Sequence, residues 1–125
     1  MIASSTEKIK SARTLAFEAL YEIFEKDAYA NLTIQSILRW CPLKKEERHL
    51  LTELIYGVCR KYNYCLWLIG LISDRPMFKI HPAVRILLAL GIYQIVFLDR
   101  IPESAAVNET VKIAKKVTHI GNVKF

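Results

Sequence analysis

Residues 83–98 read AVRILLALGIYQIVFL, the longest apolar stretch in the chain. The stretch is shorter than the roughly 20 residues that span a bilayer, and it contains Arg85 and Gln94. A helix that is apolar on nearly every side is instead typical of one that other helices surround. We therefore expect a soluble helical bundle built around this helix, and no membrane association.

Helical periodicity continues on both sides of this stretch. It predicts helices over residues 5–26, 31–41, 44–60 and 62–73 upstream, and over residues 102–118 downstream. Ser4 and Glu7 have capping-box spacing at the start of the first helix, and Asn31 can cap the second. No strand-like alternation competes with these signals, so the fold class is all-α, with about six to seven helices.

The last predicted helix separates apolar from basic residues. We expect its inner face to contain five small or branched side chains: Ala106, Val107, Val111, Ala114 and Val117. Lys112, Lys115 and Lys116 then face outward. Lys10 and Arg13 form a second basic group on the first helix, three residues apart. Each group can contact phosphates or can simply solvate an amphipathic helix, and both interpretations remain open.

Size and charge narrow the classes of protein. The 125 residues suit one domain and are too few for a binding module plus a cofactor-binding enzyme domain. The 18 Lys and Arg residues against 12 Asp and Glu give a net charge of +6. This excess suggests a polyanionic partner, although an ordinary soluble surface explains it equally well.

The sequence offers no catalytic, cofactor-binding or metal-binding residues. Its four glycines lie more than ten residues apart, so no Gly-rich loop can cradle a nucleotide or S-adenosylmethionine. Cys41 before Pro42 is the one hint of a nucleophile, and we interpret it as a structural thiol. The three cysteines and three histidines lack the close spacing of a zinc site, so we expect reduced thiols. With no secretory signal visible, the expected location is cytoplasmic.

Four segments together resemble a known family. They read ARTLAFEAL at 12–20, ERHLLTELIYGVCR at 47–60, LLALGIYQI at 87–95 and IPESAAVNETV at 101–111. These segments resemble NusB-type domains, in particular the N-terminal RNA-binding domain of rRNA cytosine-5 methyltransferases of the Sun (Fmu) type. Gly57 and Gly91 fall within helical segments, where glycine costs about 1 kcal/mol relative to alanine, so we expect close helix packing at both.

The resemblance implies a NusB-like helical bundle over residues 1–125 that binds rRNA without catalysing a reaction. Arg13 matches an arginine that NusB proteins direct toward RNA, whereas Lys10, Lys112, Lys115 and Lys116 are candidates on charge alone. Residues 122–125 look like the entry to a further helix. We therefore expect an N-terminal fragment of an enzyme whose absent methyltransferase domain binds S-adenosylmethionine and is itself a partner of this one.

Two other functions fit the same resemblance. The chain can be a freestanding NusB-like antitermination factor that binds RNA and a ribosomal protein. It can also be an interdomain or protein-interaction scaffold whose basic faces are incidental. A dimer, as some NusB proteins form, is compatible with all three.

Overall fold

The computed structural model describes residues 10–98 and 101–118, and every regular element in these two ranges is helical. The all-α prediction is confirmed. The described residues divide between Tyr56 and Gly57 into two compact units, and each unit is described by itself.

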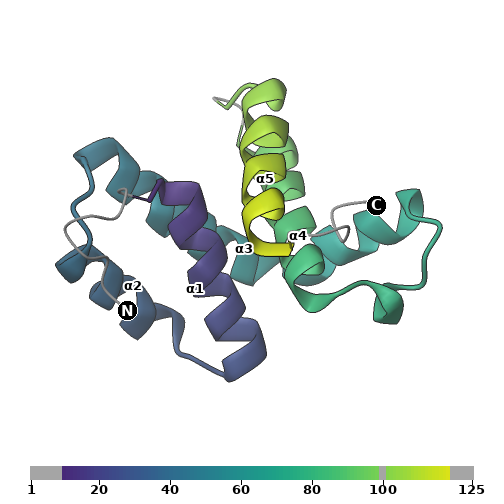
Figure 1. The fold of residues 1–125 in the computed structure, drawn as a ribbon, viewed down its shortest axis with the longest axis horizontal. Helices are drawn as coiled ribbons and strands as arrows, with labels where there is room; N and C mark the ends of the chain where they lie inside the picture. The colour runs from purple at the N-terminus through teal and green to yellow at the C-terminus, as the bar shows by residue number, and fades with distance from the viewer. Residues whose placement is uncertain (1–9, 99–100, 119–125) are drawn as a thin grey trace. The chain divides into compact units, whose positions relative to one another are not determined.

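The first unit contains α1 (Ala12–Lys26), α2 (Ala30–Trp40) and the first part of α3 (Lys45–Ile72). Figure 1 shows α1 and α2 as neighbours, joined by a short connection. Asp27 ends α1 in the left-handed conformation (φ 58°), which turns the chain back so that the Ala28 N–H donates to the Glu22 carbonyl (3.1 Å). Leu15 and Leu20 of α1 and Ile34 of α2 are buried.

The starts of both helices differ from the prediction. The expected cap at Ser4 and Glu7 lies outside the described residues, and α1 begins at Ala12 after the N-cap Ser11. The Ser11 hydroxyl accepts a hydrogen bond from the Thr14 N–H (3.2 Å), as an N-cap should. Asn31 is not a cap, because Tyr29 precedes α2 and the helix already includes Ala30.

The predicted break at residue 61 is wrong, because α3 continues as one helix of 28 residues. Only Lys61 separates the two apolar patterns, and lysine is a good helix former that gives the chain no reason to turn. The described residues consequently contain five α-helices where about six to seven were expected. A 3₁₀ turn, η1 (Met77–Lys79), follows the break at Pro76.

In the second unit, α4 (Pro82–Phe97) is the apolar helix, and it is buried along most of its length. His81 caps it, since its Nδ1 accepts a hydrogen bond from the Ala83 N–H (3.1 Å). Gln94 is completely buried, and its Nε2 donates to the Leu90 carbonyl one turn earlier (3.1 Å). This bond satisfies part of the amide inside an otherwise apolar setting.

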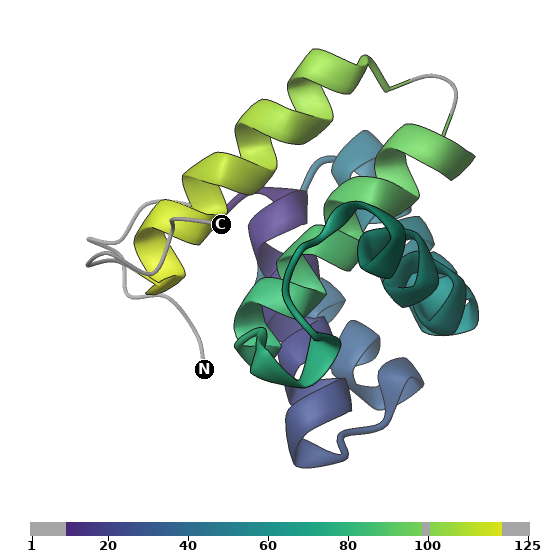
Figure 2. The same ribbon diagram turned by 90° about the vertical axis from the view of Figure 1, so that its right-hand side faces the viewer.

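Helix α5 (Glu103–Thr118) packs antiparallel along α4, as Figures 1 and 2 show. The prediction of its inner face was partly wrong, because Val107 and Val111 are exposed while Ala106 and Ile113 are buried. Both sets have helical spacing, so periodicity alone could not choose between two stripes about 100° apart.

Gly57 and Gly91 lie at close helix contacts within the second unit, as the sequence suggested. A Cβ built on Gly57 would overlap the phenol ring of Tyr93 on α4. A Cβ on Gly91 would lie 3.3 Å from the Thr110 Oγ1 of α5. Glycine therefore lets α4 approach each neighbour more closely than alanine would.

Candidate nucleic-acid interface

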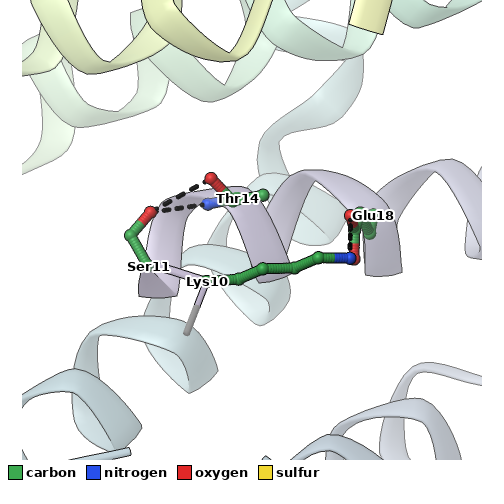
Figure 3. A network of polar contacts seen from close by, with 4 residues as sticks. All are labelled: Lys10, Ser11, Thr14 and Glu18. Carbon is green, nitrogen blue, oxygen red and sulfur yellow. Dashed lines mark hydrogen bonds and ion pairs between the residues drawn. The ribbon is translucent and has the colours of Figure 1, made fainter. Parts of the chain in front are cut away.

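The first predicted basic group lies at the start of α1. Lys10 precedes the helix and is exposed, and its Nζ forms an ion pair with the Glu18 Oε2 at 2.8 Å, two turns along the helix. Figure 3 shows this pair beside the Ser11–Thr14 cap. Arg13 is half-buried on α1, and it too interacts within the protein. The positive charge of Lys10 is thus partly offset by a carboxylate.

The second group lies on α5. Lys112 and Lys115 are exposed, and the Lys112 Nζ lies 3.4 Å from the Glu109 Oε2 in an i,i+3 pair. Lys116 belongs to the same helix, but its side chain is outside the described residues. Lys112 and Lys115 are three residues apart, so their side chains project from adjacent positions on α5.

These two groups belong to different units, the first to residues before Tyr56 and the second to residues after Gly57. Each group therefore stands as a separate cluster of cations. Glu18 and Glu109 each offset the charge of one lysine in these clusters. Exposed ion pairs of this kind contribute only about 0–1 kcal/mol to stability. Pairs this weak leave each lysine able to bind a phosphate in place of its carboxylate.

Sequence reasoning missed a third group of exposed residues on α2 and the start of α3. Trp40 is exposed at the end of α2 beside Arg39. Arg48 of α3 donates from its Nη1 to the Leu38 carbonyl (3.0 Å). The spacing of exposed residues along α2 could have revealed this group, since Trp40 falls on the same helical face as Arg39.

A shallow groove of about 750 Å³ lies between α1 and α2, and Lys10 is one of its lining residues. Glu18 and Glu22 also line it, together with Tyr29 and Leu32. Its mixed charge makes it less suited to a polyanion than the surface of α2 that carries Arg39.

The three cysteines are free thiols. Burial raises the pKa of Cys65 to about 11. The pKa of Cys59 is also raised by burial, against a smaller opposite effect of the Arg60 charge. Within residues 10–98 and 101–118, no three His, Cys, Asp or Glu side chains gather where they could hold a metal ion. A protonated, buried Cys65 is suited to packing and not to nucleophilic attack.

Alkylation should separate the three thiols. At pH 8 we expect iodoacetamide to modify half-buried Cys41 first and to leave buried Cys65 untouched until the protein is unfolded.

The raised pKa of Cys65 also means that, as the pH rises, the unfolded chain loses the Cys65 thiol proton before the folded chain does. The free energy of unfolding should therefore fall as the pH rises from 9 to about 11. Mass spectrometry of quenched samples reads each site, and equal rates at Cys41 and Cys65 would contradict the burial.

None of the helices in the described part of the chain is both long enough and apolar enough to cross a membrane.

The fold and the sequence together define the class: the chain belongs to the NusB family, whose model matches residues 10–125. It is also similar to longer proteins. It is 43% identical over 105 residues to a probable ribosomal RNA small subunit methyltransferase B of Synechocystis sp. and 36% identical over 118 residues to one of Bacillus subtilis. It is 37% identical over 103 residues to a putative methyltransferase of Mycobacterium tuberculosis.

These alignments cover most of this chain but little of its relatives. They include 84% and 94% of this chain for the first two relatives and 82% for the third. The matched part amounts to 24%, 26% and 22% of the respective relatives. The chain thus spans about a quarter of the length of the curated relatives it matches.

Proposed function

We propose that this chain is the non-catalytic RNA-binding domain of an S-adenosylmethionine-dependent rRNA (cytosine-5) methyltransferase, and that it helps the enzyme to hold rRNA. The observation that carries the proposal is the similarity to two proteins named as rRNA small subunit methyltransferase B, over most of this chain and about a quarter of theirs. In this proposal residues 1–125 are one NusB-like domain at the N-terminus of a longer cytoplasmic protein.

The basic side chains support the binding half of this proposal. Lys112 and Lys115 project from α5 into solvent, where ammonium groups can reach phosphates with little desolvation cost. Lys10 can also reach a phosphate once its ion pair with Glu18 is broken. Arg13 and Lys116 complete the set of five cations that we propose for RNA contact.

The state of Cys65 in the described part of the chain supports the non-catalytic half. Cys65 is buried and its pKa is raised, so it is a poor nucleophile. In this proposal S-adenosylmethionine binds to the methyltransferase domain of the intact protein, which is also the second partner of this domain.

Neutralising two of the cations tests RNA binding directly. If about five phosphates of a single strand are contacted, log affinity should fall by roughly 3.5 per tenfold rise in salt. Arg13→Gln with Lys115→Gln should lower that slope to roughly 2 and weaken binding about 20-fold near 0.1 M salt. Fluorescence anisotropy with a labelled single-stranded fragment of 16S rRNA, measured over a salt series, gives both values.

The matched control is Lys26→Gln with Lys79→Gln, which removes the same charge, one lysine from each unit, outside the proposed sites. It should leave affinity within about twofold. Because Arg13 is half-buried, Lys112→Gln with Lys115→Gln provides a second variant that changes only exposed side chains. Equal losses in the test and control variants, or no binding by the unmodified chain, would refute the proposal.

A second candidate, the interdomain or protein-interaction scaffold, is favoured by one observation. Tyr64, Trp67 and Leu71 are exposed at helical spacing on α3, and the Tyr64 and Trp67 rings stack with centroids 5.7 Å apart. An apolar stripe of this kind can bind protein. In that case the Arg13 and Lys115 variant leaves rRNA methylation by the intact protein unchanged. Reading the gene beyond residue 125 distinguishes both functions from a freestanding antitermination factor.

A further inference from the structure

The outer face of α2 combines an aromatic ring with polar and cationic groups. Five exposed residues follow the i, i+3, i+4, i+7, i+8 spacing that places side chains on one helical face: Leu32, Gln35, Ser36, Arg39 and Trp40. The opposite face packs inward through Ile34, which is buried. Helix α2 contains no Asp or Glu at all.

This face borders a groove of about 540 Å³ that Arg48 of α3 completes. The bond from the Arg48 Nη1 to the Leu38 carbonyl (3.0 Å) fixes the guanidinium beside the end of α2. A guanidinium has five N–H donors, so others remain for an anion. Arg39 and Arg48 both line the groove with Trp40, and no carboxylate is among the lining residues.

We propose that this groove binds one unpaired nucleotide of the RNA, with its base stacked on Trp40 and its phosphate held by Arg39 and Arg48. This inference rests on the proposed RNA-binding function and adds a specific subsite to it. Gln35 and Ser36 supply hydrogen-bonding groups at the same face.

Charge and ring chemistry together favour a nucleotide over an apolar peptide. The groove lining contains two arginines and no carboxylate, so it suits a negatively charged phosphodiester better than an uncharged peptide segment. An indole offers a flat face on which any base can stack, an interaction that is sequence-tolerant and strong in single-strand binding. The volume also lies within the usual range for small-molecule sites.

Tryptophan fluorescence provides a local test, because the chain has only two tryptophans, Trp40 and Trp67. They are matched in exposure, at 55% and 58%. In a Trp67→Phe variant the remaining emission comes from Trp40, and a single-stranded 16S rRNA oligonucleotide should quench it in proportion to binding. In the Trp40→Phe variant the same oligonucleotide should leave the Trp67 emission nearly unchanged.

Affinity provides the second readout. Trp40→Ala should weaken binding of that oligonucleotide about tenfold, whereas Trp67→Ala should change it by less than twofold. Arg39→Gln should weaken binding and reduce the salt slope by at most about 0.7, the value for one lost phosphate contact on a single strand, because Arg48 still contacts the same phosphate. Circular dichroism of each variant verifies that the helices are intact.

The outcomes separate this subsite from RNA binding in general. If the unmodified chain binds the oligonucleotide and Trp40→Ala binds it equally well, the subsite is refuted and the proposed function stands. Quenching of Trp67 without quenching of Trp40 would refute it as well. If the unmodified chain does not bind at all, the proposed function fails together with the subsite.

Discussion

Lys61→Pro should destabilise the second unit by about 3 kcal/mol or more, because residue 61 lies within the unbroken helix α3. Proline has no N–H to donate to the carbonyl four residues earlier, and its ring collides with that carbonyl. For a chain of this length the loss corresponds to a fall in Tm of about 10 °C, measurable by circular dichroism. Tolerance of proline here would mean that the chain breaks at residue 61.

Two controls isolate the backbone effect. Lys45→Pro makes the same exchange at the first residue of α3, where the N–H has no helical partner, and it should change the Tm little. Lys61→Ala removes the contact between the Lys61 Nζ and the Phe97 ring, which lie 5.5 Å apart, without affecting the backbone. The difference between the proline and alanine variants measures the cost of interrupting α3.

Gly57→Ala should be destabilising by about 1–3 kcal/mol, even though alanine is the better helix former. The new methyl group overlaps the ring of Tyr93, which is buried and stacks on Phe97 with centroids 5.2 Å apart. Relief requires the whole ring to leave its stacked position or α4 to move away. Urea unfolding followed by circular dichroism measures the change.

Gly70→Ala is the matched control, because it lies on the same helix with nothing within 4 Å of the added Cβ. It should be stabilising, by up to about 1 kcal/mol. Gly57→Ala should cost less stability in a Tyr93→Leu background than in the unmodified chain, since the shorter leucine side chain leaves room for the added methyl group. Equal effects of the two glycine substitutions would show that Gly57 is not at a close contact.

The helical class and the burial of α4 could be read from composition and periodicity, since no other element explains an apolar run of that length. The helix boundaries could not be predicted in the same way. The helix continues through Lys61 because no proline or glycine interrupts it there, and such an absence is a weaker signal than the proline that ends other helices. The face of α5 depended on which of two equally spaced stripes contacts α4, and the packing that buries Ala106 and Ile113 and exposes Val107 is not visible in the spacing.

The basic candidates could be predicted because Lys and Arg are identified directly from the sequence, but the carboxylates that pair with them could not. Glu18 lies eight residues from Lys10, whereas the pairing rules for helices cover separations of three and four residues. The pair forms because Lys10 precedes α1 and its long side chain extends along the helix. Trp40 was hidden for a different reason. An aromatic residue at a helix end can equally be core or surface, and its exposure depends on packing between helices.

The pair between Lys10 and Glu18 has a kinetic consequence if the chain binds RNA. An incoming phosphate must first displace the Glu18 carboxylate, so Lys10 attracts a passing strand less than an unpaired lysine would. A Glu18→Gln variant should therefore bind every RNA sequence slightly more tightly, by up to the roughly 1 kcal/mol that an exposed ion pair contributes, a change that the Kd at low salt would reveal.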